Sequence, residues 1–270
     1  MAFRPQVFGL RLPFQFDYYL MLGALIGFYL LMPVGVMVLT RYAWIIHLFY
    51  CLLLFSGVMA AETNRRAFVV SIVLATGVFV LGWIPFIFGP STAHRVVYLV
   101  FNLAFVSFTV FVLLRAIFLA GRVNTEAICA ALCVYFLIGL FWSFGYQLIE
   151  RMDPGAFDLS AHAVLFEEVK AFATEEGLEQ LHAYDIVEAM IFTYYSLITL
   201  TTVGYGDVTP LHPLAMTLSA IQGFLGQIYI AVLVGWLVGV RVSASVIARQ
   251  AAKSEVEERK SEVEEPRSDE

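Results

Sequence analysis

Charged residues are scarce in this 270-residue chain, in which they make up only 14% of the sequence. Soluble globular domains carry about 25% charged residues. Hydrophobic residues instead reach 60%, and the mean hydropathy is +0.81. This composition excludes an ordinary soluble domain and predicts a polytopic membrane protein.

Cysteine is also rare. The three cysteines, Cys51, Cys129 and Cys133, all lie inside apolar runs, where a thiol behaves as a small hydrophobic side chain. We therefore expect neither a disulfide framework nor a metal cluster, and no bound cofactor. The net charge of −6 resides mostly in two acidic surface segments, so it gives no indication of nucleic-acid binding.

Long apolar runs, in contrast, are abundant. About 20 apolar residues span a bilayer core, and runs near or above that length cover residues 18–40, 43–61, 67–89, 96–120, 127–149 and 214–241. A further apolar run, 186–200, is too short to cross and follows a polar segment. We expect it to form a re-entrant half-helix, within an all-α membrane protein that has six transmembrane helices.

Lysine and arginine in the loops predict the orientation, because short cytoplasmic loops are enriched in these residues. With the amino terminus inside, the cytoplasmic side receives Arg4, Arg11, Arg65, Arg66, Arg122, Arg241, Arg249 and Lys253. The outer side receives Arg41, Arg95, Arg151 and Lys170. We therefore expect both termini in the cytoplasm and the protein in the plasma membrane, which is the inner membrane if the host is bacterial.

Residues 201–207 read TTVGYGD, and this is the most informative segment of the chain. Gly204 and Gly206 can adopt a positive φ at little steric cost. Successive carbonyls can then face one axis, which the alternating geometry of a strand does not allow. Such a row of oxygens can surround a dehydrated cation. Thr202 can add its hydroxyl, and Tyr205 should turn its ring away from the axis and brace the segment.

Residues 127–241 contain a helix, an outer loop, the half-helix, TTVGYGD and a last helix. This order resembles the pore module of tetrameric potassium channels, specifically the small bacterial six-helix type. In that family the carbonyls of the TVGYG loop replace the water around K⁺ and form the selectivity filter. The resemblance implies a filter made of Thr201, Thr202, Val203, Gly204, Tyr205 and Gly206. It implies bound K⁺, as the permeant ion, at Thr202, Val203, Gly204 and Tyr205.

The resemblance extends to residues around the filter. Tyr194 and Tyr195 stand where the family carries two aromatic residues that support the filter. Asp207 matches the acid just outside it, and the resemblance implies that this acid accepts hydrogen bonds from the aromatic pair and adds negative potential at the mouth. Ile198 stands where some relatives carry a buried glutamate, so inactivation behaviour stays open.

The last helix carries Gly226 at the position of the family's gating hinge. A glycine in a transmembrane helix more often marks close packing than bending, so both interpretations stay open. By the same resemblance, the residues that line the cavity and its gate are Gln227, Ile230, Val234, Val238 and Val242.

One chain contains one filter segment, whereas a ring of carbonyls around an ion needs four. We therefore expect a homotetramer with closed cyclic symmetry, whose partners are its own copies and membrane lipid. The predicted domains are a cytoplasmic amino terminus (1–17), a four-helix membrane domain that resembles a charge-poor voltage sensor (18–125), a pore domain (126–241) and a charged cytoplasmic tail (242–270).

The fourth predicted helix lacks the arginine at every third position that voltage-gated relatives carry. Steps of three reach Val106, Thr109, Val112, Arg115, Phe118 and Gly121, of which only one is charged. Arg115 lies close enough to the cytoplasmic end to extend its charge to the surface. We expect little intrinsic voltage sensing, and the sequence does not indicate what opens the pore.

The outer segment 150–185 is rich in acids. Leu165, Val169 and Phe172 fall on one helical face, which predicts a short external helix. The acids form either a vestibule that concentrates cations or a solvated surface, and the sequence leaves both interpretations open.

Several other functions compete with a potassium channel. A non-selective monovalent cation channel keeps the pore, but Tyr205 favours potassium. An intramembrane aspartyl protease of the GxGD type would use Asp185 and Asp207, yet only a half-helix separates these acids, where that family has adjacent spanning helices. A secondary transporter should show a repeat of the broken helix, and the first four runs contain none. We expect no enzymatic activity.

Overall fold

The computed structural model describes residues 16–38, 43–60, 65–88, 91–119, 125–175, 180–236 and 239. The chain divides into one compact unit that ends at Ile228 and a second that starts at Tyr229, and we describe each by itself. The described residues are mostly helical, as the sequence predicts for an all-α protein.

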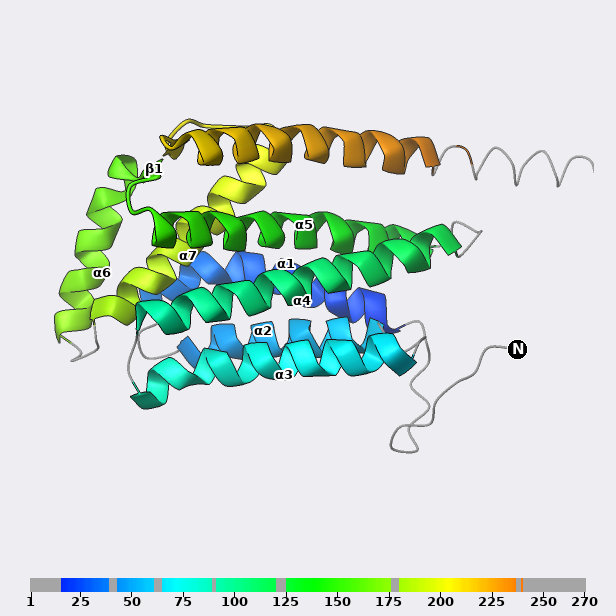
Figure 1. The fold of residues 1–270 in the computed structure, drawn as a ribbon, viewed down its shortest axis with the longest axis horizontal. Helices are drawn as coiled ribbons and strands as arrows, with labels where there is room; N and C mark the ends of the chain where they lie inside the picture. Colours follow the sequence, from blue (N-terminus) through cyan, green and yellow to red (C-terminus); the bar gives the residue numbers. More distant parts are fainter. Residues whose placement is uncertain are drawn as a thin grey trace, which may run out of the picture. The chain divides into compact units, whose positions relative to one another are not determined.

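The helices and strands follow one another in a simple order (Figure 1). They are α1 (Phe16–Val38), α2 (Ala43–Ala60), α3 (Arg65–Phe88), α4 (Thr92–Leu119), α5 (Thr125–Met152), β1 (Phe157–Asp158), the 3-10 turn η1 (Ser160–His162), α6 (Ala163–Glu175), α7 (Gln180–Leu200) and β2 (Thr209–Pro210). A last helix, Pro213–Trp236, follows β2.

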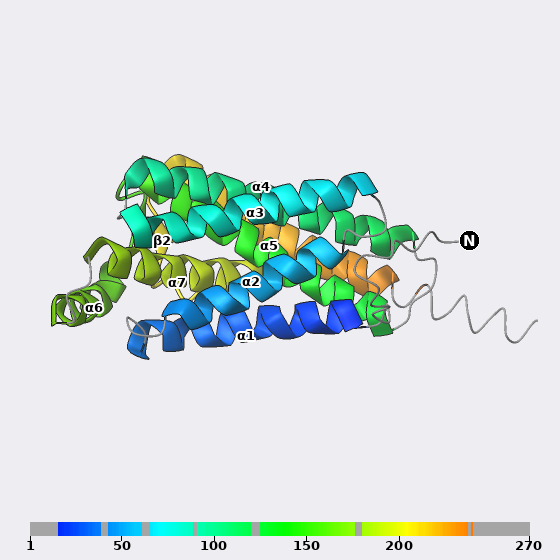
Figure 2. The ribbon, with the colours of Figure 1, turned by 90° about the horizontal axis from the view of Figure 1, so that it is seen from below.

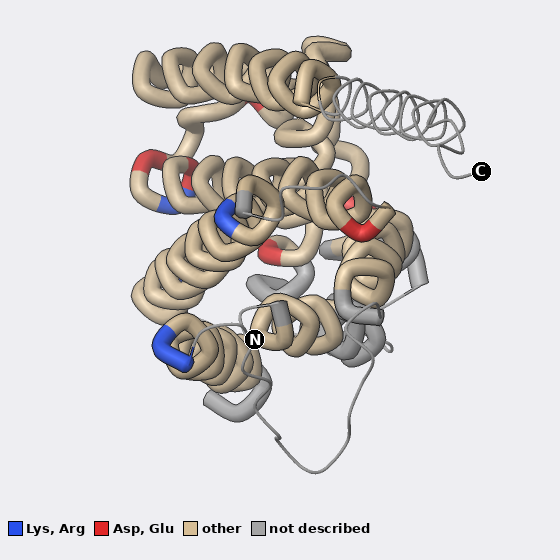
Figure 3. Tube along the Cα trace, turned by 90° about the vertical axis from the view of Figure 1, so that its right-hand side faces the viewer, with Lys and Arg blue, Asp and Glu red and all other residues tan. Residues whose placement is uncertain are grey.

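Helices long and apolar enough to cross a membrane cover Arg65–Ile84, Thr92–Phe118, Thr125–Met152 and Pro213–Trp236. These confirm the predicted apolar runs from the third to the sixth as candidate spans. Within α1 and α2 the apolar helical stretches are shorter, Tyr18–Met32 and Tyr50–Met59, so their crossing stays a prediction. Figure 3 shows few charged positions along the described helices, as expected for a membrane protein.

Helices α2 and α3 pack on α4 at two glycines, each of which leaves space for an aromatic ring of α4. A Cβ added at Gly57 in α2 would lie 2.9 Å from the Phe105 ring, and one at Gly77 in α3 would lie 2.6 Å from the Phe101 ring. Both rings belong to α4, one turn apart. Figure 2 shows α3 beside α4 and α1 beside α2. Small residues allow close helix approach inside a membrane, where no hydrophobic effect drives association.

The predicted half-helix is longer than the sequence indicated. It forms α7 and begins at Gln180, whereas the apolar pattern began at residue 186. The physical reason is that the polar start of α7 packs on α6, where the Tyr184 and Phe166 rings stack with centroids 5.0 Å apart. The helix α6 itself, Ala163–Glu175, confirms that a short helix forms here, and its external location stays a prediction.

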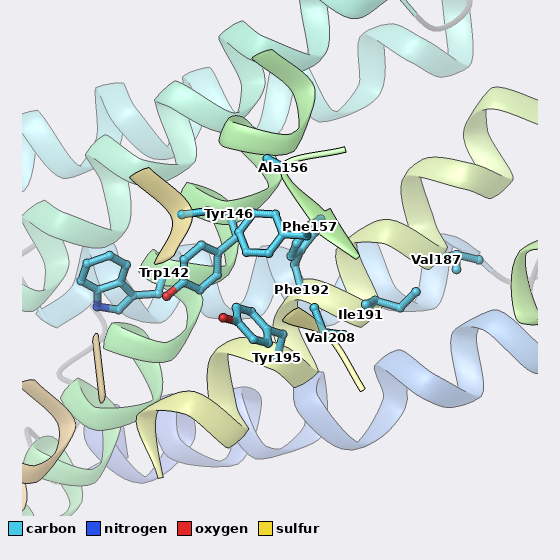
Figure 4. Close-up of a cluster of buried hydrophobic side chains, with 10 residues drawn as sticks. Trp142, Tyr146, Ala156, Phe157, Val187, Ile191, Phe192, Tyr195 and Val208 are labelled. Carbon is cyan, nitrogen blue, oxygen red and sulfur yellow. The ribbon is translucent and has the colours of Figure 1, made fainter. Parts of the chain in front are cut away.

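An aromatic core joins α5, β1 and α7 (Figure 4). The Tyr146 ring of α5 is completely buried. Its centroid lies 5.4 Å from that of Phe157 and 5.1 Å from that of Tyr195, and the Phe157 and Phe192 rings are 4.9 Å apart at 72°. Offset and edge-to-face aromatic pairs of this kind stabilise a core beyond the area that they bury. The core therefore holds α7 in place beside α5.

A two-residue antiparallel ladder connects the segment that follows α5 to the chain that follows TTVGYGD. In it Phe157 pairs with Pro210, and Asp158 pairs with Thr209. The Ala156 carbonyl also accepts hydrogen bonds from the amides of Leu211 (2.7 Å) and His212 (3.1 Å). Both ends of the segment around α6 and α7 are therefore held together.

Candidate functional site

The segment Thr201–Asp207, here called the TTVGYGD loop, leaves the carboxyl end of α7. Its backbone has a positive φ at Thr202 (60°), Gly204 (50°) and Gly206 (79°), which is every second residue. Left-handed φ is unusual for a residue with a Cβ, and Thr202 is the one such case among the described residues. Positive φ at every second residue departs from the strand geometry, in which successive groups alternate in direction.

The amide groups of the loop point back toward α7. The Val203 amide donates to the Ile198 carbonyl at 2.8 Å, the Gly204 amide donates to the same carbonyl at 3.2 Å, and the Thr202 amide donates to Thr199 at 3.1 Å. Each N–H lies opposite the preceding C=O in a trans peptide, and no cis peptide is present in the described chain. The carbonyls of residues 201–203 are therefore directed away from α7.

The TTVGYGD loop is exposed to solvent in the single chain. Residues 201–206 are all exposed, with Val203 at 52% and Tyr205 at 74%. The sequence predicted that Tyr205 would turn outward and brace the loop. Within one chain the ring is largely uncovered, so a brace would have to come from another molecule.

Asp207, at the carboxyl end of the loop, has two partners. The Tyr194 hydroxyl donates to its Oδ2 at 2.8 Å, and His162 Nε2 lies 3.4 Å from the same oxygen. Burial, together with the Asp207 carboxylate, raises the pKa of Tyr194 to about 12, which keeps this phenol protonated as a donor. His162 was not identified from the sequence, because nothing in the η1 segment signals its approach to a residue 45 positions later.

Tyr195, which the sequence grouped with Tyr194, faces elsewhere. Its hydroxyl donates to Ser219 Oγ at 2.8 Å, and its ring belongs to the aromatic core. It therefore contacts the Pro213–Trp236 helix and not the TTVGYGD loop.

A group of buried polar side chains, here called the polar seam, connects α7 to α5 and to the Pro213–Trp236 helix. Its members are Ser143, Gln147, Thr193, Ser196 and Gln222. The hydroxyls of Ser143 and Thr193 are 2.9 Å apart, and the Ser196 hydroxyl donates to the Gly139 carbonyl at 2.6 Å. Gln222 donates to the Ser196 carbonyl at 2.9 Å and accepts from the Tyr146 hydroxyl at 2.6 Å. Buried polar groups that are satisfied in this way hold neighbouring helices in one arrangement. Sequence analysis missed all of these residues.

The Pro213–Trp236 helix approaches the end of α7 at Gly226. A Cβ added there would lie 2.2 Å from the Leu200 carbonyl oxygen, so only glycine fits. The contact favours the packing interpretation of Gly226, and its role as a hinge stays a prediction. The next residue, Gln227, donates to the Thr202 hydroxyl at 3.3 Å.

The remaining residues predicted to line the cavity are described only in part. Ile230 and Val234, in the second unit, are 40% and 52% exposed. Val238 and Val242 lie outside the described residues. Among the described residues, no group of three or more His, Cys, Asp or Glu side chains could hold a metal ion.

Residues 164–240 match the family model described as "Ion channel". This match indicates an ion channel. It covers nearly all of α6, the whole of α7, the TTVGYGD loop and the Pro213–Trp236 helix, which are the parts that assemble the geometry described above. Neither the curated proteins nor the solved structures contain a match to the chain.

The contact at Gly226 yields a stability prediction. Gly226→Ala should destabilise the protein by about 1–3 kcal/mol, because the added Cβ overlaps a backbone oxygen and overpacking of a tight contact costs that much. The unfolding temperature of the purified protein in detergent measures the effect. Gly223→Ala is the matched control, since its Cβ would make an ordinary 3.6 Å contact with the Thr199 carbonyl oxygen. Equal unfolding temperatures for the two variants would contradict the prediction.

Proposed function

We propose that this protein is a potassium-selective channel in which four copies each contribute one TTVGYGD loop to a central filter. The observation that carries the proposal is the positive φ at Thr202, Gly204 and Gly206, together with amides that are bonded back to α7. Carbonyls freed in this way are the ligands that potassium filters use. K⁺ binds at Thr202, Val203, Gly204 and Tyr205, and no other cofactor takes part.

The apolar and loop surface that is exposed in a single chain supports the proposed tetramer. The loop is exposed, and the Pro213–Trp236 helix exposes large apolar side chains up to the end of the first unit. These are Leu214, Met216, Ile221, Phe224, Leu225 and Ile228. Three further copies cover part of this surface and supply the packing for Tyr205, while lipid covers the rest.

Weak voltage sensing is part of the proposal. On α4, Val106, Thr109 and Val112 are buried and uncharged, and Arg115 is the single charge on their stripe. Displacement of one charge per chain provides about 2.3 kcal/mol per 100 mV, which makes opening only weakly dependent on voltage. The channel lies in the plasma membrane with both termini in the cytoplasm.

The alternatives are supported less well. The GxGD-type protease needs Asp185 and Asp207 to act together, but Asp185 is paired with Arg151 and Asp207 with Tyr194. A non-selective cation channel predicts the same architecture, and ion selectivity separates it from the proposal.

Selectivity tests the proposal directly. In planar bilayers with K⁺ on one side and Na⁺ on the other, the purified protein should reverse near the K⁺ equilibrium potential. Tyr205→Val should lose most of this selectivity because the ring that braces the loop is removed, whereas Tyr205→Phe should retain it. A native protein that passes Na⁺ as readily as K⁺ would leave only the non-selective alternative.

The assembly provides an independent test. Native mass measurement in detergent should give four times the 30.2 kDa mass of the chain, because a closed ring of four loops is required. A monomer that retains selective conduction would refute the proposal.

The hydrogen bond between Tyr194 and Asp207 should stabilise the conducting loop. Tyr194→Phe removes a bond to a charged group, which contributes about 1.5–3 kcal/mol, so K⁺ current should decay faster during sustained recording. Tyr195→Phe is the control, because its hydroxyl bonds to Ser219 and not to Asp207. The same acceleration in both variants would contradict this role of Tyr194.

A further inference from the structure

A cluster of charged side chains lies where α4, α5 and α7 meet, away from the TTVGYGD loop. Arg151 of α5 donates to Asp185 Oδ1 at 2.5 Å and to Glu188 Oε2 at 2.6 Å. The two acids are three residues apart on α7 and therefore share one helical face. Their side chains are 19% and 11% exposed, and that of Arg151 is 22% exposed.

The cluster continues into α4. Arg95 donates to Gln147 Oε1 at 2.8 Å and to the Asp185 carbonyl at 3.4 Å. Gln147, which is 1% exposed, in turn donates to the hydroxyl of Ser143 at 3.2 Å. Since Ser143 bonds to Thr193 of α7, the cluster joins the polar seam that supports α7. Hydrogen bonds from the two arginines therefore connect α4, α5 and the first half of α7, the helix that carries Tyr194.

Glu188 is the member of this cluster whose charge is most sensitive to pH. Burial raises the pKa of Glu188 to about 7, against the opposing effect of the Arg151 and Arg95 guanidinium groups. Asp185 and Glu150 are the other charged groups that act on Glu188, and both raise its pKa. The residue lies in α7, which is not among the candidate membrane spans.

We infer that Glu188 and Arg151 are positioning residues of the pore, whose ion pair holds α7 against α5 and weakens when Glu188 takes up a proton from the outer solution. The inference rests on the proposed function. A protonated acid forms a weaker bond to arginine than a carboxylate does, and Arg151 then retains only Asp185. Because α7 also carries Tyr194, a weaker attachment of α7 to α5 lets Tyr194 move relative to Asp207. The hydrogen bond between these two residues then holds the TTVGYGD loop less firmly, and conduction falls.

The wild-type channel provides the first test. In symmetrical K⁺ with the outer pH varied between about 5.5 and 8.5, the current should fall about threefold or more on acidification, with a midpoint near the pKa of about 7. The same change on the inner side should have no effect. A current that does not depend on outer pH in this range would overturn the inference.

Variants of the cluster separate loss of the pH response from a shift of its midpoint. Glu188→Gln should remove the fall of the current on acidification, here called the pH step. Arg151→Gln should also remove the step and hold the current at its acid level, because no ion pair is left for the proton to weaken. Asp185→Asn keeps the pair and should move the midpoint to lower pH, because that carboxylate raises the pKa of Glu188. A Glu188→Gln channel that keeps the wild-type step would overturn the inference. If that variant does not assemble, the other two variants decide, and a step that persists in Arg151→Gln would overturn the inference.

Two controls separate Glu188 from other titratable groups. Glu168→Gln makes the same chemical change on the exposed surface of α6 and should leave the pH profile unchanged. His162→Gln removes the imidazole that lies 3.4 Å from Asp207 and should also keep the step. Loss of the step in His162→Gln would assign the effect to the mouth and refute the inference. A protein without conductance at any pH would refute the proposed function, and this inference with it.

Discussion

The TTVGYGD loop depends on the carbonyl of Ile198, which accepts hydrogen bonds from two successive amides, those of Val203 and Gly204. A helix ends with unsatisfied carbonyls, and here the following loop satisfies them. The same bonds direct the opposite faces of these peptide groups away from the helix. A loop that caps a helix in this way therefore also presents oxygens to whatever lies beside it.

The position of the TTVGYGD loop therefore depends on how firmly α7 is held. The aromatic core around Tyr146 holds α7 laterally, while the polar seam gives the helix one register, because Ser196 must meet both Gly139 and Gln222. Packing alone specifies distance, whereas directional hydrogen bonds specify rotation about the helix axis. At the far end the Arg151 ion pairs add a third constraint, so the support extends along the whole of α7.

The sequence indicated the TTVGYGD loop and the helices, but not the contacts that hold α7 in place. Positive φ at Gly204 and Gly206 could be expected because glycine has no Cβ, and the apolar runs marked the helices by length alone. Thr202 adopts the same backbone region without any sequence signal, in a stretch where its own amide bonds to Thr199 and the next amide bonds to Ile198. His162, the second partner of Asp207, and the partners of Gln222 come from segments distant in sequence, and no local pattern identifies such contacts. The early start of α7 was missed because its stabilising neighbour, Phe166, belongs to another helix.

The ladder between β1 and β2 has a mechanical consequence. It joins the residues after α5 to those after the TTVGYGD loop, and Ala156 accepts amide bonds from both Leu211 and His212. A displacement of the segment that follows α5 is thus transmitted to the residues after the TTVGYGD loop without first passing through α7. Any movement of β1 is therefore also a movement of β2, so the residues that follow Asp207 cannot shift independently of those that follow α5.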